Sequence, residues 1–209
     1  MAIDPRKRQK KLERRAAKQK AERRELVRRE SLGLYPRMKQ ASAAPILHCG
    51  AMEAIFRSGI GSVLVSRELP NGDVAFAAFL VDVYCLGVKN VIVNILPRAR
   101  YDRDLYGKMT REDKWLPLKP ECARKLVEGA VQYALDLGLP PHPEYRMGRL
   151  IFGDISAEAC PERYTYGKDG KPFFFAGPYD DPARCQAILR TLENRCGPHG
   201  YHYVVPMSM

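Results

Sequence analysis

The order of apolar and polar positions along the chain predicts a polar N-terminal arm followed by one folded domain. Between Pro5 and Glu30 the apolar side chains are few and small, and they form no stripe that would bury against a core. From Ile46 onward, apolar runs alternate with turns rich in Gly, Pro, Asn and Asp. We therefore expect an arm over residues 1–40 and a single domain over residues 41–209, a length sufficient for one sizeable core.

Within the domain, the apolar runs predict a three-stranded meander. Ser62 to Leu69 and Val74 to Tyr84 flank the turn Pro70-Asn71-Gly72-Asp73, where Asn-Gly supplies the positive φ angles of a tight hairpin. The second run is apolar on both faces, which indicates an interior strand. Val88 to Leu96 continues the meander as a third strand.

Helical spacing and stop signals predict the helices. A short helix is expected at 48–57, a long one from Pro120 to a Gly138–Pro140 stop, and a last one between Asp181-Pro182 and Gly197-Pro198. Residues 98–117 are interpreted as a charged loop. Further short strands are expected at 145–152, 164–166, 173–175 and 201–205, the middle two forming a second hairpin around Lys168-Asp169-Gly170-Lys171. The predicted fold class is α+β: a mostly antiparallel sheet with two or three packed helices, preceded by a helical or disordered basic arm.

Charge is distributed very unevenly. The whole chain has a formal net charge of +11, and residues 1–40 hold 15 Lys/Arg against 5 Asp/Glu, whereas the remaining residues hold 20 against 19. The arm therefore accounts for +10 of the net charge. The thirteen cations predicted to bind nucleic acid are Arg6, Lys7, Arg8, Lys10, Lys11, Arg14, Arg15, Lys18, Lys20, Arg23, Arg24, Arg28 and Arg29.

Such a segment suits phosphate neutralisation, because each contact releases counterions and needs charge density more than a fixed geometry. The predicted partner is RNA or a ribonucleoprotein; RNA is favoured over DNA because no helix-turn-helix, zinc-finger or zipper pattern accompanies the arm. Three other interpretations stay open: a solvated tail, a nuclear-localisation signal, or a patch that rests on anionic lipid. The missing apolar face weakens the lipid interpretation.

Cysteine usage and hydropathy bear on the compartment. The six cysteines show no CxxC spacing, and the chain start has no apolar signal-peptide core. We interpret them as reduced thiols of a cytoplasmic protein. No apolar run approaches the roughly 20 residues of a membrane-spanning helix.

Asp82 is the most suggestive carboxylate, because it interrupts an apolar strand and a buried charge needs a partner. The stretch from Phe79 to Asn90 loosely resembles the first motif of RNase-H-like nucleases, in which an aspartate on a central strand binds a divalent metal and a Gly-apolar-Lys-Asn turn follows. In that family the glycine follows the aspartate sooner than Gly87 does here. Glu128 and Asp154 are the candidates for further metal-binding carboxylates. A metal-dependent nuclease or related hydrolase is therefore the alternative function, and no cofactor is expected except a divalent metal in that case.

Other candidate chemistry is local. Cys196, His199 and His202 have loop-compatible spacing for zinc, although a fourth ligand is not evident. His142 beside Glu144 stands in a rigid proline-rich connection, where a purely structural role is equally well explained. The chain contains no P-loop, GxGxxG or GxSxG signature.

Aromatic residues of the second hairpin offer a base-stacking surface with cations at its tip, although alternation assigns some of these rings to packing. The residues concerned are Tyr164, Tyr166, Phe173, Phe175, Lys168 and Lys171.

Overall fold

The computed structural model describes residues 33–177 and 180–205. The chain divides after Arg37, and the larger unit, Met38–Met209, contains the sheet and the helices discussed below. Residues 33–41 are helical. Met38 and Ala41 in this helix are buried, so the last residues of the predicted arm contribute to the core of the larger unit.

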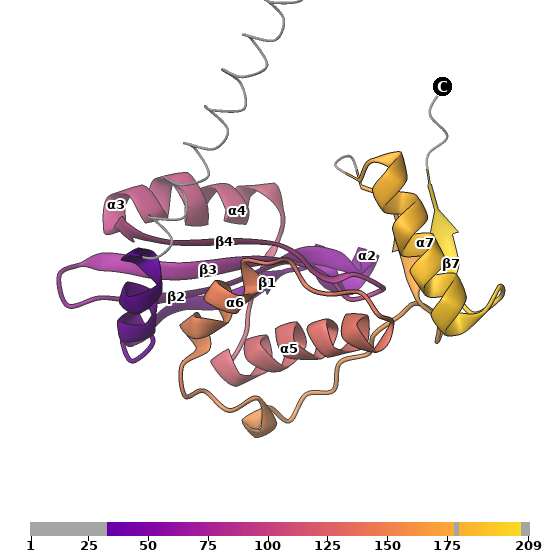
Figure 1. Cartoon of the computed structure of the whole chain (residues 1–209). Coiled ribbons are helices and arrows are strands. Elements are labelled where there is room, and N and C mark those ends of the chain that lie inside the picture. The colour runs from indigo at the N-terminus through magenta and orange to yellow at the C-terminus, as the bar shows by residue number, and fades with distance from the viewer. Residues whose placement is uncertain (1–32, 178–179, 206–209) are drawn as a thin grey trace, which may run out of the picture. The chain divides into compact units, whose positions relative to one another are not determined.

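The larger unit is built on a five-stranded antiparallel sheet in the order β4-β3-β2-β1-β5 (Figure 1). The strands are β1 (Ile46–Met52), β2 (Ile60–Glu68), β3 (Asp73–Asp82), β4 (Gly87–Pro97) and β5 (Trp115–Pro117). The predicted α+β class and the meander of β2, β3 and β4 are confirmed. β3 pairs on both sides, as its two apolar faces predicted.

The turn between β2 and β3 has a different geometry from the predicted one. Gly72 has a φ of 80°, whereas Asn71 does not adopt a positive φ. The Gly72 N–H donates to the Leu69 carbonyl at 2.9 Å, and the Asn71 side chain accepts from the Asp73 N–H at 3.1 Å. Proline presets the first corner of this turn, so only the last loop residue has to be left-handed.

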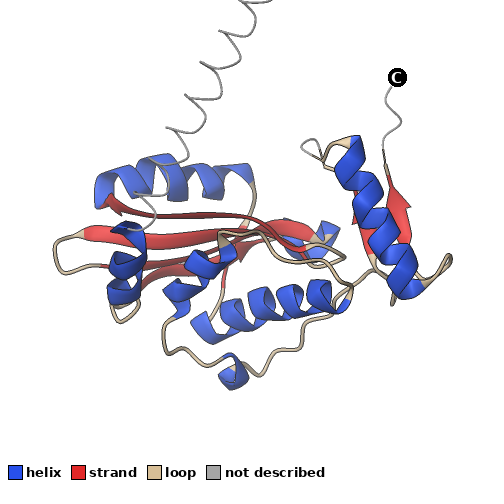
Figure 2. Ribbon diagram, in the orientation of Figure 1, coloured by secondary structure: helices blue, strands red, loops and turns tan. Residues whose placement is uncertain are grey.

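Helices cover both faces of the sheet (Figure 2). One face carries α3 (Arg98–Tyr101), the π-helical η1 (Asp102–Tyr106) and α4 (Gly107–Glu112). The other carries α5 (Pro120–Asp136), α6 (Tyr145–Gly148) and the 3-10 helix η2 (Arg149–Phe152). Tyr101 packs on the first face against Phe76, and Phe152 stacks on Phe79 on the second. Both faces of the central strands are therefore shielded from solvent.

Three local predictions were wrong. Residues 98–117 are helical over most of their length, because Tyr101, Leu105 and Met109 recur at intervals of four and pack on the sheet. Residues 145–152 form helices, with Gly148 packed closely on Phe79 and Val91. Of the helix predicted at 48–57, only α2 (Ala54–Ser58) exists, since the preceding residues pair as β1 between β2 and β5.

The C-terminal part combines α7 (Pro182–Cys196) with β6 (Phe173–Phe175) and β7 (His202–Val204). The α7 prediction is confirmed, and the Asp181 side chain caps the helix by accepting from the Arg184 N–H at 2.8 Å. The second hairpin was wrong: β6 pairs in parallel with β7, and residues 164–166 form no strand. Only its tight turn exists, closed by a bridge between Lys168 and Lys171.

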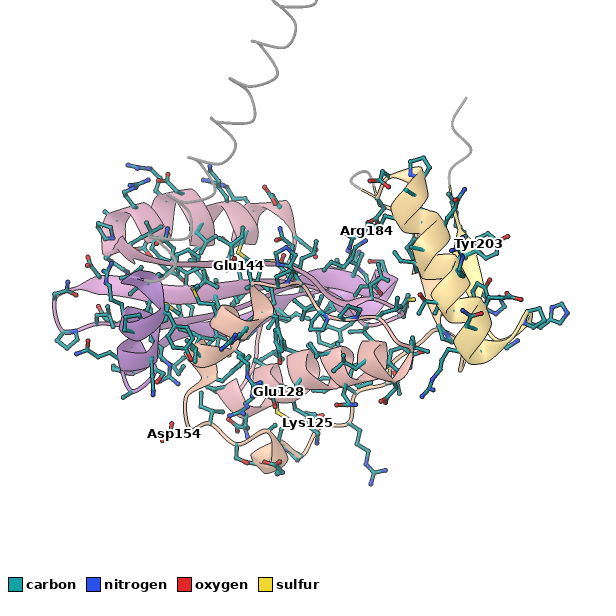
Figure 3. All side chains as sticks on the ribbon, in the orientation of Figure 1. Lys125, Glu128, Glu144, Asp154, Arg184 and Tyr203 are labelled. Carbon is teal, nitrogen blue, oxygen red and sulfur yellow. A yellow bond between two sulfur atoms is a disulfide. The ribbon has the colours of Figure 1, made fainter. Side chains whose placement is uncertain are left out.

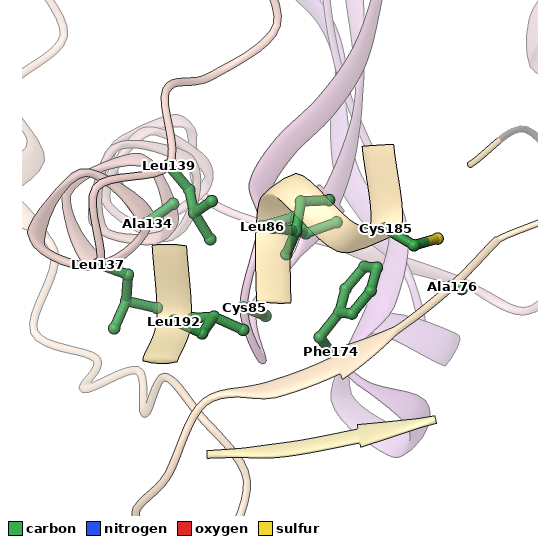
Figure 4. Close-up of a cluster of buried hydrophobic side chains, with 10 residues drawn as sticks. Cys85, Leu86, Ala134, Leu137, Leu139, Phe174, Ala176, Cys185 and Leu192 are labelled. Atoms are coloured by element: carbon green, nitrogen blue, oxygen red, sulfur yellow. The ribbon is translucent and has the colours of Figure 1, made fainter. Parts of the chain in front are cut away.

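A shared apolar cluster joins this C-terminal part to the sheet (Figure 4). It combines Cys85 and Leu86 from the β3–β4 turn with Leu137 and Leu139 from the end of α5. Its other members are Ala134, Phe174, Ala176, Cys185, Ile188 and Leu192. These side chains are nearly inaccessible to solvent, so α7 and β6 are packed against the rest of the unit rather than appended to it.

The interpretation of all six cysteines as reduced thiols was wrong for two of them. Cys122 in the first turn of α5 and Cys160, which follows η3 (Ala157–Ala159), form a disulfide. They lie 38 residues apart in sequence, and only the fold brings their Cα atoms to 4.9 Å. Cys49, Cys85, Cys185 and Cys196 are free thiols. Among the residues that the structure describes, no helix is long and apolar enough to cross a membrane.

Candidate functional site

The thirteen cations of the predicted nucleic-acid interface, Arg6 through Arg29, lie outside the described residues. Their role stays a prediction. The remaining candidates all lie in the larger unit, where their surroundings can be compared with the roles expected of them.

Asp82 ends β3 and is 6% exposed. Its Oδ1 accepts hydrogen bonds from the backbone N–H groups of Tyr84 at 2.9 Å and Cys85 at 3.0 Å. Burial raises the pKa of this carboxyl to about 6, although these donors and the charge of Lys89 act in the opposite direction. The carboxylate thus organises the β3–β4 turn.

Glu128 and Asp154, the other two acidic candidates, are labelled in Figure 3. Among the described residues they are not grouped with Asp82 into a metal-ligand set. Glu128 on α5 accepts from the Arg124 guanidinium at 3.0 Å, one helical turn away. Asp154 is exposed in the loop after η2. Within residues 33–177 and 180–205, no three His, Cys, Asp or Glu side chains are grouped so as to hold a metal ion.

The same finding covers the zinc candidates Cys196, His199 and His202. The backbone of both histidines takes part in local structure: the His199 carbonyl accepts from Lys171 Nζ at 2.9 Å, and the His202 N–H donates to the Pro172 carbonyl at 2.8 Å. The two imidazoles are exposed.

His142 joins the proline-rich connection to the sheet. Its N–H donates to the Val88 carbonyl at 2.9 Å, which extends the hydrogen bonding at the start of β4. The ring Nδ1 accepts from the Glu144 N–H at 3.2 Å. When the imidazole is neutral, its proton is therefore on Nε2.

The predicted stacking surface is divided by the fold. The Tyr166 hydroxyl lies 3.3 and 3.2 Å from two α5 carbonyls, and Tyr164 stacks on Phe56 of α2, so these two rings serve packing. Phe173 lies below the Lys168 ammonium, 4.9 Å from ring centroid to nitrogen. Phe175 is 56% exposed on β6. Only the β6 half of the predicted surface has an open ring.

One charged cluster was not found from the sequence. Asp180 accepts from Lys89 Nζ at 3.1 Å, from Arg184 Nε at 3.0 Å and from the Gly177 N–H at 2.9 Å. Burial alone would raise the pKa of Asp180, but the Gly177 N–H and the two cations outweigh it and lower the pKa. Lys89 and Asp180 are 91 residues apart, so no local spacing reveals their pairing.

This cluster lies at a cavity of about 350 Å³ between the start of β4, the proline-rich connection and α7. Lys89, Arg184 and His142 line it together with apolar side chains. Figure 3 labels Arg184 on α7 and Glu144 next to the proline-rich connection. The arrangement concentrates hydrogen-bond donors beside an apolar wall.

The chain matches no known family model, no curated protein and no solved structure.

Proposed function

We propose that this protein binds RNA or a ribonucleoprotein, with the basic arm making phosphate contacts that do not depend on sequence. The observation that carries the proposal is the partition of charge, with 15 Lys/Arg against 5 Asp/Glu in residues 1–40 and near balance elsewhere. A polyanion is the partner that such a segment stabilises most, because every neutralised phosphate releases counterions.

Ion pairs on the larger unit support this uneven distribution of charge between the arm and the rest of the chain. Arg98 pairs with Asp102 and Glu68, and Arg100 and Arg103 both lie beside Asp104. Carboxylates therefore compensate much of the positive charge on the α3–η1 surface. The broad attraction for a polyanion is therefore expected from the arm.

The test compares the full chain with a variant that lacks residues 2–32. A deletion that reached residue 40 would remove the buried Met38 and confuse loss of binding with loss of folding. Binding to a fluorescent 20-nucleotide single-stranded RNA is followed by anisotropy between 50 and 200 mM salt. If about six cations engage phosphates, log Kd changes with log salt at a slope of about 4 to 5, so the affinity falls roughly 250- to 1,000-fold over this range.

A matched pair of arm variants separates charge from shape. If about six of the thirteen cations engage phosphates, replacing Arg14, Arg15, Arg23 and Arg24 by Gln should lower the salt slope by about 1, whereas replacing them by Lys should leave it nearly unchanged. Retention of full affinity and slope by the deletion variant contradicts the proposal. Recovery of the protein from its cells in low and in high salt, with sequencing of bound nucleic acid, then identifies the partner.

A further inference from the structure

The cavity beside α7 has a distinctive chemistry. Among the described residues, its polar side chains are Lys89, His142 and Arg184, and no carboxylate lines it. Leu86, Leu139 and Ile188 provide apolar wall, continued by the prolines of the connection. The volume of about 350 Å³ lies at the lower end of the range for small-molecule sites.

Asp180 orients the two cations without facing the cavity. It occupies the Nε atom of Arg184 and one donor position of Lys89. The other guanidinium nitrogens and the remaining ammonium protons stay available for a second acceptor. Two cations against one carboxylate leave the cavity wall with a net charge of about +1.

His142 adds a third donor. Because its Nδ1 accepts from the Glu144 N–H, the neutral ring carries its proton on Nε2. All three polar side chains of the cavity therefore donate hydrogen bonds. A purely structural link between α7 and the sheet would need only the Lys89–Asp180 pair, whose side chains are 12% and 5% exposed. The Arg184 side chain is 55% exposed.

We propose that this cavity binds a small organic anion, a carboxylate or a phosphate carried on a compact apolar body. Arg184 and Lys89 hold the anionic group, with charge-assisted hydrogen bonds. His142 donates to the same group or to a polar atom next to it. Leu86, Leu139 and Ile188 bury the apolar body. The site does not depend on the arm or on binding of RNA.

The test is calorimetric titration of the full-length protein at 150 mM salt with four probes: benzoate, phenyl phosphate, benzyl alcohol and inorganic phosphate. Benzoate or phenyl phosphate should bind at least about tenfold more tightly than benzyl alcohol, which has the same ring and no charge. Comparison of the two anions decides between a carboxylate and a phosphate site. Inorganic phosphate reports binding that needs no apolar body, whether at the arm or at the two cations of the cavity.

The variants Arg184→Gln and Arg190→Gln form the matched pair, since both residues are exposed on α7 and only Arg184 lines the cavity. Arg184→Gln should weaken binding of the aromatic anion about 10- to 100-fold with an unchanged melting midpoint. Arg190→Gln should change neither the binding nor the midpoint. If Arg184→Gln lowers the midpoint, His142→Gln, which leaves the Lys89–Asp180 pair intact, provides the same comparison. Equal binding of benzyl alcohol and benzoate, equal effects of the two arginine variants, or no binding of either aromatic anion at about 10 mM would each overturn the proposal.

Discussion

Replacement of the buried Arg67 should destabilise the domain. This residue lies on β2 and is 5% exposed, with Nε donating to the Ile151 carbonyl at 2.7 Å and Nη2 to the Phe152 carbonyl at 3.1 Å. Nη1 donates to the Ala44 carbonyl. Among the described residues no carboxylate pairs with this guanidinium, and burial lowers its pKa. The side chain thus ties η2 and the turn before β1 to the sheet.

The magnitude follows from these acceptors. Arg67→Met keeps the apolar stem and removes every donor, which leaves the buried Ile151 carbonyl without its partner. The Phe152 carbonyl loses one hydrogen bond and keeps the one from the Ile155 N–H at 3.1 Å. An unsatisfied buried acceptor costs about 1–3 kcal/mol, and relief from burying a charge offsets part of the sum. We expect a loss of about 2 kcal/mol in the free energy of unfolding. For a domain of this size that lowers the melting midpoint by roughly 4–8 °C.

Urea unfolding, followed by the fluorescence of Trp115 and by circular dichroism, measures the difference. Arg57→Met is the control, because the Arg57 side chain is 66% exposed and pairs only with surface carboxylates. It should change the stability by less than about 0.5 kcal/mol. An Arg67→Met protein within 1 kcal/mol of the wild type would refute the account of Arg67 as a buried tie between η2 and the sheet.

Two further predictions concern Asp82 and the disulfide. The pKa of Asp82 in the folded protein, about 6, lies above its ordinary value of 3.8. Protonation therefore stabilises the fold: this contribution is fully present below about pH 4 and is lost as the pH rises through 6. The difference in unfolding free energy between wild type and Asp82→Asn should change by about 3 kcal/mol across that window, and a constant difference in urea titrations at several pH values would contradict it. Reduction of the Cys122–Cys160 bond, which closes a separation of 38 residues, should cost about 4 kcal/mol in the loop-entropy account; an equal urea midpoint with and without reductant would show that the bond is not formed or has no effect.

Local signals explain which parts of the fold were predictable. The meander of β2, β3 and β4 has continuous apolar runs and a Pro-Asn-Gly turn, and α5 and α7 have a proline at the start and a glycine at the end. Residues 98–112 carry the same helical spacing in Tyr101, Leu105 and Met109, but their many charges hid it. Those charges form pairs such as Arg98 with Asp102, which stabilise the helix rather than a loop.

Features that join distant segments were not predictable. The parallel pairing of β6 with β7 replaces the expected hairpin because His202–Val204 returns to Phe173–Phe175 after the whole of α7. The Lys89–Asp180 pair and the Cys122–Cys160 bond likewise depend on the fold. The sequence did single out Asp82 as an unusual buried carboxylate, and the structure accounts for it by hydrogen bonds to its own turn. A buried charged residue in a strand therefore indicates a structurally constrained position, and does not by itself indicate a catalytic role.

A basic arm alone cannot select one polyanion, because counterion release depends on charge density and is nearly independent of sequence. If RNA or a ribonucleoprotein is the partner, selectivity has to come from the domain. Its compensated surface charges make a second broad electrostatic contact a poor means of selection. Contacts of fixed geometry remain, such as the open Phe175 ring or the donors around Arg184. These two kinds of contact separate experimentally, because the arm's contribution falls steeply with salt while stacking and a partly buried ion contact are screened far less. The RNA affinity that remains at high salt therefore measures the contribution of the domain.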